Sequence, residues 1–310
     1  MASSPIPYPL DPVVVTGTTI TMDQYLNAPT VMLRRIADIS AQMFFAHKIF
    51  SNGGGVSGGA ILFERPNPLL TDLFTERRLQ EMAPGTQAPV ITFVRGVPMV
   101  AVPREIGGKF ALTKQELKRN NPRLVEMAMT QIGNTIARDL EVMALSELNA
   151  VISSTSRTFA STQTLATSAA FTFTTKTAAN QPSADVGRLV ATIQNEGRGH
   201  RMNSVIYNSL DWATLTSMYS GASGAESGEA GARQMLAAHG ITTVDVSIQQ
   251  TAGKAKFYEA GMVGTWSTEF PLEHITWQDP EEDNKRWDQF TVSPCYAIDD
   301  QYALVEQSGL

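Results

Sequence analysis

The chain has 310 residues, of which 43% are hydrophobic and only 17% are charged, and its net charge is −6. Because a low charged fraction leaves a monomer little polar surface, we expect the protein to bury surface against copies of itself. The acidic balance argues against a protein that wraps nucleic acid in a basic groove. The single cysteine, Cys295, excludes an intrachain disulfide and a thiolate metal cluster, and no apolar run is long enough to span a membrane.

The N-terminal region is expected to begin extended and to continue as a helix. Prolines at positions 5, 7, 9 and 12 exclude a helix there and predict an arm or a tail. The same residues lack the basic start and apolar centre of a signal peptide, which favours a protein kept in a cytosol. Apolar side chains at helical spacing over residues 30–50 predict an amphipathic helix.

A glycine run at residues 53–59 follows this helix. Gly53, Gly55 and Gly58 fit the dinucleotide-binding pattern G-x-G-x-x-G, but that motif needs a strand before it and a helix after it. Here a helix precedes the run and a strand-like stretch, 60–63, follows it. We therefore predict a flexible hinge at this run.

Residues 77–95 have the pattern of a two-stranded arm, with strands at 77–83 and 89–95 and a turn at Pro84-Gly85. Both faces of this hairpin are partly apolar, and an isolated hairpin is marginal in water. We expect its own domain or a neighbouring subunit to cover it. Further strands are predicted at 97–102 and 109–112, with a bend at Gly107-Gly108, followed by a short helix that Thr113 and Glu116 cap.

The longest predicted element is a helix over residues 121–148, which Asn121 can cap and which Pro122 can begin. We interpret it as a spine, with Glu141 on its polar side, along which other elements pack. Gly133 lies mid-helix, where we expect it to permit bending or close packing. The apolar stripe of the spine consists of Val125, Met129, Ile132, Ile136, Leu140 and Met143.

Residues 153–183 are rich in serine, threonine and alanine and predict loops with a short strand at 171–174. After Pro182 the pattern changes to a compact α/β unit. Helices are predicted at 184–196, at 211–218 and in a segment that ends at Ala238. Strands are predicted at 204–207 and at 241–248, where apolar residues alternate, and residues 288–305 are expected to return as strands to the sheet.

The order of these parts resembles the major capsid proteins of tailed bacteriophages, in particular those of actinobacteriophage type, which share the Hong Kong 97-like fold. The resemblance covers nearly the whole chain. The stretches that carry it are the helix into Phe50, the segments 58–64 and 107–113, the hairpin 77–95, the spine and the late α/β unit.

The resemblance implies an α+β chain with an N-terminal arm and helix (1–59), an extended loop (60–103) and a peripheral domain with the spine (104–183). An α/β axial domain (184–277) and C-terminal strands (278–310) complete it. The implied function is self-assembly as hexamers and pentamers into an icosahedral head around double-stranded DNA, within the host bacterial cytoplasm. The residues expected at subunit contacts are Arg77, Arg78, Leu79, Pro84, Gly85, Ile91, Phe93, Lys114, Lys118, Arg119, Glu281 and Glu282.

Two departures from the family pattern affect the expected partners. No lysine lies between Lys48 and Lys109, so we predict no covalent network through a loop lysine of the kind found in the phage that names the fold. The proline-rich start leaves no room for a long helical scaffolding segment, so a separate scaffolding protein or a removed longer precursor is implied. A portal is expected, a decoration protein is left open, and packaged DNA is expected to be touched only non-specifically.

No catalytic set, cofactor site or metal site is predicted. The four histidines, His47, His200, His239 and His274, include no pair at ligand spacing. The basic turn 198–201 could hold a phosphate, but a loop paired with a neighbouring subunit is the better interpretation. The acidic turn 279–283 lacks the spacing of a calcium loop and is better explained as solvated, or as the partner of the loop arginines.

Three functional hypotheses follow. The first is the phage head protein, which is a structural protein and not an enzyme. The second is the shell of an encapsulin-type nanocompartment, which shares the fold and encloses protein cargo. The third is a cytosolic α/β enzyme built on residues 184–246, which would need a pocket and would form a small discrete oligomer.

Overall fold

The computed structural model describes residues 34, 45–67, 75, 81–82, 85, 87–88, 90–91, 95–119, 122–162, 165, 182–219, 228–280 and 285–310. The helices are α3 (Ala46–Ile49), α4 (Lys114–Arg119), α5 (Pro122–Thr155), α7 (Pro182–Asn195), α8 (Ser209–Tyr219), α9 (Gly228–Ala238) and the 3-10 turn η3 (Gln301–Ala303). The strands are β1 (Ser51–Gly55), β2 (Ile61–Arg65), β3 (Val97–Ala101), β4 (Ile106–Leu112), β5 (Thr158–Ala160), β6 (Ser204–Asn208), β7 (Thr243–Ser247), β8 (Lys254–Tyr258), β9 (Thr265–Asp279), β10 (Lys285–Ala297) and β11 (Leu304–Ser308).

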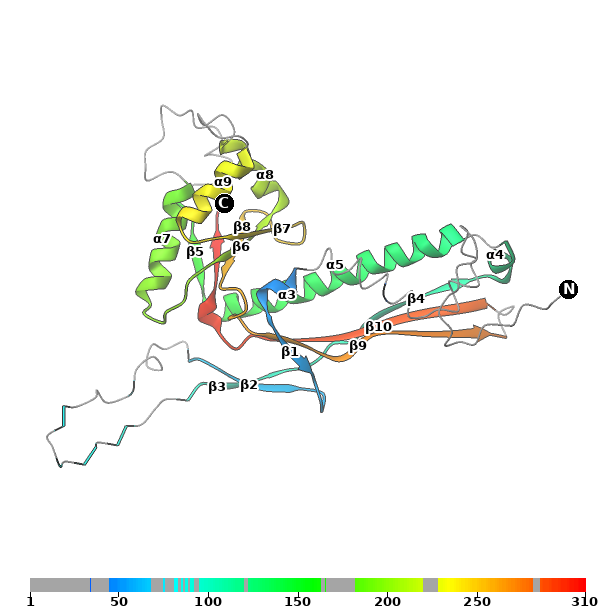
Figure 1. Cartoon of the computed structure of the whole chain (residues 1–310), viewed down its shortest axis with the longest axis horizontal. Helices are drawn as coiled ribbons and strands as arrows, with labels where there is room; N and C mark the ends of the chain where they lie inside the picture. Colours follow the sequence, from blue (N-terminus) through cyan, green and yellow to red (C-terminus); the bar gives the residue numbers. More distant parts are fainter. Residues whose placement is uncertain are drawn as a thin grey trace, which may run out of the picture.

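Helix α5 is the predicted spine and runs beside a long sheet (Figure 1). It continues seven residues beyond the predicted end at Leu148, to Thr155. Val125 and Met129 of the predicted stripe are buried against Leu112 and Phe290 of the sheet. The short helix α4 before it has the predicted capping box, because Thr113 N donates to Glu116 Oε2 at 2.9 Å and Glu116 N donates to Thr113 Oγ1 at 3.3 Å.

The long sheet has four strands in the order β1-β9-β10-β4. Strand β4 is longer than predicted, and Gly107 lies inside it instead of forming a bend. A Cβ there would come within 2.7 Å of the Phe290 carbonyl oxygen, so the absent side chain allows two strands to approach closely. The glycine run is also more ordered than predicted, because residues 51–55 form β1, parallel to β9, and only Gly58 and Gly59 lie in a bend.

The second sheet has five strands in the order β5-β11-β8-β6-β7, and helices α7, α8 and α9 gather on one side of it in a compact lobe (Figure 1). The three helices and the strands β6 and β7 occur where the sequence pattern predicts them, whereas β5 and β8 were not predicted. Their shared core includes Leu189 of α7, Leu215 of α8, Leu236 of α9 and Phe257 of β8. Strands β10 and β11, the predicted C-terminal strands, belong to the first and second sheet respectively, so the chain end ties the two sheets together.

Strand β7 buries polar side chains, although apolar residues alternate along this stretch of the sequence. Val246 and Ile248 are exposed, whereas Asp245 and Ser247 are buried. The physical reason is that α3 and α5 supply partners on that face. Lys48 pairs with Asp245, and Ser247 donates to Glu141, which is also buried and not on a wet face as predicted.

The extended loop begins and ends in a two-stranded ribbon, β2 paired antiparallel with β3, which projects from the body (Figure 1). The pairing lies nearer the base of the loop than the predicted strands 77–83 and 89–95. The described residues within those two ranges are not in strands. The rest of both ranges, most of the helix 30–50, the strand 171–174 and the cap Asn121 lie outside the described residues.

Candidate functional site

The ribbon presents an exposed apolar face. Leu62 and Val100 are cross-strand partners with exposed fractions of 75% and 60%, and Val102 beyond the end of β3 is exposed as well. A two-stranded ribbon has little core of its own, so such a face is stable in water only with a partner. This face is therefore a candidate surface for assembly.

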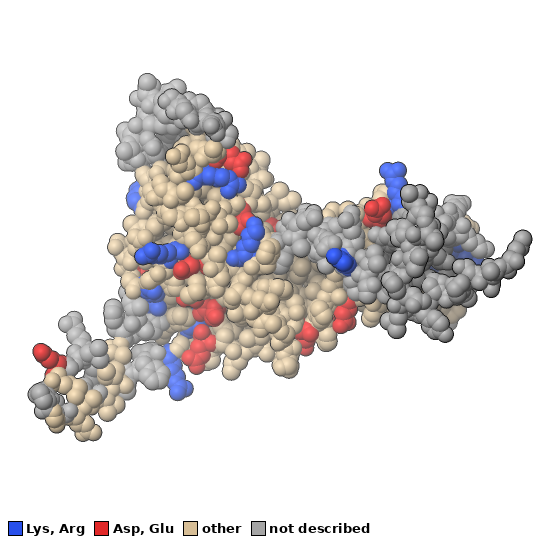
Figure 2. All heavy atoms as spheres, viewed as in Figure 1, with Lys and Arg blue, Asp and Glu red and all other residues tan. Residues whose placement is uncertain are grey.

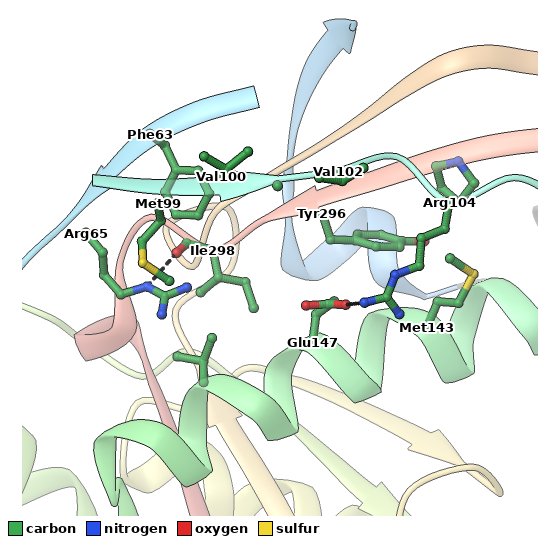
Figure 3. A pocket seen from close by; sticks show the side chains of 13 residues that line it. Phe63, Arg65, Met99, Val100, Val102, Arg104, Met143, Glu147, Tyr296 and Ile298 are labelled. Atoms are coloured by element: carbon green, nitrogen blue, oxygen red, sulfur yellow. Dashed lines mark hydrogen bonds and ion pairs between the residues drawn. The ribbon is translucent and has the colours of Figure 1, made fainter. Parts of the chain in front are cut away.

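The ribbon also covers a pocket of about 240 Å³ over the spine, and Val100 and Val102 are among the residues that line it (Figure 3). Phe63 and Met99 of the ribbon lie opposite Met143 of α5 and Tyr296 of β10. Arg104 pairs with Glu147 of α5 at 2.8 Å across the pocket. The ribbon and the spine thus share the lining of this pocket, and one ion pair joins them at the root of the ribbon.

The base of the loop is held by an irregular turn, residues 298–302, which we call the anchor turn. Arg65 Nε donates to the Ile298 carbonyl oxygen at 3.1 Å. Gln301 Nε2 donates to the Pro66 carbonyl oxygen at 3.0 Å, and the Tyr302 hydroxyl donates to the Asn67 carbonyl oxygen at 3.1 Å. These bonds fix where the chain leaves β2 for the extended loop.

Other exposed apolar side chains lie on the spine and the long sheet. Met127 and Leu124 are exposed on the side of α5 away from the sheet core. On the sheet, Trp277 and Trp287 stack with ring centroids 6.3 Å apart, and Lys109 Nζ lies 4.5 Å from the centroid of Trp287. A cation over an aromatic pair gives this surface both apolar and polar contact chemistry.

Charged side chains are scattered over the described surface. Figure 2 shows isolated basic and acidic residues separated by wide areas without charge, and no extended patch of one sign among the described residues of this face. This arrangement agrees with the low charged fraction of the sequence. It suits contacts between like subunits better than a basic groove for nucleic acid.

The residues expected at subunit contacts are only partly described. Gly85 is exposed in a turn with φ of 89°, Ile91 is half-buried, and Lys114 is exposed at the start of α4. Lys118 and Arg119 lie in α4, with side chains outside the described part. Each of these contacts stays a prediction. The others lie outside the described residues: Arg77, Arg78, Leu79, Pro84, Phe93, Glu281 and Glu282.

The described histidines take separate places in the fold. His239 Nε2 lies 2.9 Å from Ser183 Oγ, and His274 pairs with Asp288 at 2.8 Å inside the long sheet. His200, in the basic turn, pairs within its own chain with two carboxylates, and the pairing of this turn with a neighbouring subunit stays a prediction. Among the described residues, no three histidine, cysteine or acidic side chains are placed to hold a metal ion.

Helix length and hydropathy also bear on membranes. Within the described part of the chain, no helix combines the length and the apolar character needed to cross a bilayer.

Sequence comparison identifies the family. A family model described as phage capsid protein matches residues 96–305, from β3 into β11 and well over half of the chain. The protein belongs to this family of phage capsid proteins. A capsid protein is a structural component of a virion, so the family indicates a structural role in a shell. No curated protein matches this capsid protein by sequence.

Solved structures agree with the family on the fold. The capsid of Myoviridae phage XM1 matches with a TM-score of 0.52 at 11% identity, covering 97% of this chain and 96% of that one. The structure from Microbacterium phage Oxtober96 matches with a TM-score of 0.58 at 9% identity, covering 87% and 90%. The virus-like particle from Pyrococcus furiosus matches with a TM-score of 0.55 at 11% identity, covering 90% and 98%. The Hong Kong 97-like fold predicted from the sequence is thereby confirmed.

Sequence reasoning missed the anchor turn and the polar interface of β7. For the anchor turn a local signal exists, because Asp300 precedes η3 and accepts from Tyr302 N at 2.9 Å, as a capping aspartate does. For β7 no local signal exists, since Lys48 and Glu141 come from distant parts of the chain.

Proposed function

We propose that this capsid protein is the major subunit of an icosahedral phage head, assembling as hexamers and pentamers around double-stranded DNA in the host bacterial cytoplasm. The observation that carries the proposal is the exposed apolar face of the ribbon, Leu62, Val100 and Val102, on a chain that belongs to a phage capsid family. In a single subunit this apolar face is exposed to water, whereas in a closed shell a neighbouring copy can cover it in every subunit.

We assign the two proposed domains to the two sheets. The spine and the four-stranded sheet would form the peripheral domain, and the five-stranded sheet with α7, α8 and α9 would form the axial domain at the capsomer centre. The extended loop, 60–103, would lie across the adjacent subunit. Each few hundred Å² of apolar surface covered there is worth several kcal/mol at about 25 cal/mol per Å², before ordering costs.

The predicted contact residues extend this proposal. Leu79, Ile91 and Phe93 would supply the apolar contacts of the loop, with Pro84 and Gly85 at its tip. The charges would pair across subunits, Arg77 and Arg78 with Glu281 and Glu282, and the α4 cluster Lys114, Lys118 and Arg119 with acidic residues elsewhere. Single exposed pairs are weak, about 0–1 kcal/mol, but they repeat at every copy in a shell.

The proposed partners are a separate scaffolding protein, a portal and packaged DNA held without sequence preference. The basis for non-specific contact is the lack of an extended basic patch on the described face (Figure 2). We propose no loop-lysine crosslink, because the sequence from 49 to 108 contains no lysine. The proposed role requires no catalytic residue.

The second candidate is a nanocompartment shell, which the similarity to the virus-like particle from Pyrococcus furiosus favours. The enzyme hypothesis loses its basis, since the capsid family match includes the whole 184–246 segment on which it depended.

The experiment that separates the two shells is a measurement of particle contents after external nuclease treatment. Particles from an infected or induced host should retain nuclease-resistant double-stranded DNA if the head assignment is right. Particles that hold a defined protein cargo and no DNA would contradict the head assignment and support the nanocompartment.

A further inference from the structure

His200 lies between two carboxylates that come from different elements. Its Nδ1 atom is 3.0 Å from Glu259 Oε2, just after β8, and its Nε2 atom is 3.2 Å from Asp300 Oδ2, in the anchor turn. The imidazole side chain is only 10% exposed. A carboxylate accepts hydrogen bonds, so both nitrogens can serve these partners only when both carry protons, as in the imidazolium ion.

The environment favours that ion. The hydrogen bond to Asp300 raises the pKa of His200, burial opposes this, and the hydrogen bond to Glu259 adds to the rise, so the pKa lies above its ordinary value. Burial would raise the pKa of Asp300, but the hydrogen bond from His200, together with backbone hydrogen bonds from Tyr302 and Ala303 and the attraction of His200, holds that pKa below the ordinary range. Both directions agree with an ion pair between the anchor turn and the lobe of the five-stranded sheet with α7, α8 and α9, which we call the axial lobe.

Two arginines also contact the anchor turn. Arg157 pairs with Glu196 at 2.9 Å, and its Nη2 atom donates to the Tyr302 carbonyl oxygen at 3.3 Å. Arg198, on the same loop as His200, places its guanidinium 3.6 Å from the centroid of the Tyr302 ring. Asp299, next to Asp300 in the anchor turn, is repelled by Asp300 and attracted by Arg65, and burial raises the pKa of Asp299.

The anchor turn transmits this pairing to the extended loop. Asp300, the partner of His200, also accepts the hydrogen bond from Tyr302 N that holds η3 in shape. On its other side the same turn binds the carbonyl groups of Pro66 and Asn67 through Gln301 and Tyr302. One acidic residue therefore links His200 to the backbone at the base of the loop.

We propose that protonated His200 latches the anchor turn to the axial lobe, and that loss of its proton loosens the base of the extended loop. The latch belongs to a single chain and goes beyond the shell assignment. Its consequence for assembly, a pH-dependent presentation of the loop to a neighbour, rests on the proposed function.

The direction of the pH effect follows from linkage. The folded-state pKa of His200 is above its unfolded value, so the stabilisation is fully present below the unfolded value. It is lost as the pH rises through the folded-state pKa. The loop base is therefore held firmly at the lower pH and becomes looser at the higher pH.

The test uses hydrogen exchange with mass spectrometry on the full chain, from about pH 5 to about pH 9. Exchange at the imidazole Cε1–H gives the midpoint of His200, and protection factors of the amides of residues 61–65, 67 and 299–303 report the loop base. In the wild type we expect a midpoint above the ordinary value of about 6.5 and a roughly tenfold loss of protection at that midpoint. His200→Gln should lack the step, whereas the control His239→Gln should keep it.

Two results would overturn the latch: a His200 midpoint at or below the ordinary value, or a protection step that survives in His200→Gln. Should His200→Gln fail to fold, Glu259→Gln removes one carboxylate and keeps the imidazole. It must then move the His200 midpoint and the protection step together to lower pH, and separate movement contradicts the proposal. Both readouts come from the chain itself, so a failure to form shells would count against the proposed function alone.

Discussion

The hydroxyl of Ser247 donates a hydrogen bond to the carboxylate of Glu141, which ties the middle of the spine to the edge strand β7 inside a buried interface. The spine is thus bound to both sheets, with Met129 packed on the four-stranded sheet and Glu141 on the five-stranded one. Burial raises the pKa of Glu141, and the hydrogen bond from Ser247 opposes this rise. The charged carboxylate therefore lowers the stability of the fold at neutral pH.

Glu141→Gln should raise the melting temperature at pH 7, by on the order of 2 °C. The amide oxygen still accepts from Ser247, while the buried charge is removed. A carboxyl whose folded-state pKa is raised costs stability above its unfolded value, so the gain should vanish in acid, where Glu141 is protonated. Calorimetry at pH 4 and pH 7 tests this, and a variant less stable than the wild type at pH 7 would contradict it.

Asp288→Asn should lower the free energy of unfolding by about 3 kcal/mol. Burial would raise the pKa of Asp288, but hydrogen bonds from His274 and Arg286 outweigh it and hold the pKa below the ordinary range. Its contribution is therefore present above the unfolded pKa and is lost as the pH falls through the folded-state pKa. Urea unfolding at pH 7 measures the loss.

The matched control for this variant is Asp139→Asn, whose partner Arg138 and carboxylate are both exposed. It should cost less than about 1 kcal/mol. Equal losses for the two variants would mean that the buried group of Asp288, His274 and Arg286 stabilises the fold no more than a surface ion pair does.

Met129→Ala should destabilise the subunit by about 2–5 kcal/mol, because Met129 is fully buried between the spine and the long sheet. Met127→Ala, two residues away on the same helix and 54% exposed, should change the stability of the isolated subunit by less than about 0.5 kcal/mol. Chemical denaturation of both variants checks the orientation of the spine. Similar losses would show that the helix is rotated relative to the sheet.

Leu62→Glu should abolish shell formation while leaving the melting temperature of the unassembled subunit within about 1 °C of the wild type. The exposed face of the ribbon would then carry a charge into a contact with the next copy. Leu62→Val is the control, since it keeps an apolar, β-favouring side chain and should still assemble. Light scattering under assembly conditions gives the readout, and normal shells from Leu62→Glu would remove the ribbon face from the interface.

Much of the fold could be predicted from local patterns. The stripe from Val125 to Met143 indicated the spine, and Thr113 with Glu116 indicated the start of α4, because helix periodicity and capping are properties of neighbouring residues. Strand β7 could not be predicted correctly by the same means. Its buried face depends on Lys48 and Glu141, which only the tertiary fold brings to Asp245 and Ser247.

Local sequence patterns likewise predict only part of the candidate site. The apolar ribbon strands were visible as strand-like stretches around Leu62 and Val100. The anchor turn was not, because its role comes from bonds between residues more than 200 positions apart, such as Gln301 to Pro66. The glycine run alone predicts a hinge, but residues 53–55 lie in strand β1. Their partner strand β9 lies far along the chain, so no local pattern indicates this pairing.

Whether this chain builds a closed shell is tested most directly by sedimentation velocity and negative-stain microscopy on one purified sample. We expect uniform closed particles tens of nanometres across, alone or with a co-expressed scaffolding protein. A monomer or dimer that stays soluble at high concentration, with and without the scaffold, would contradict it.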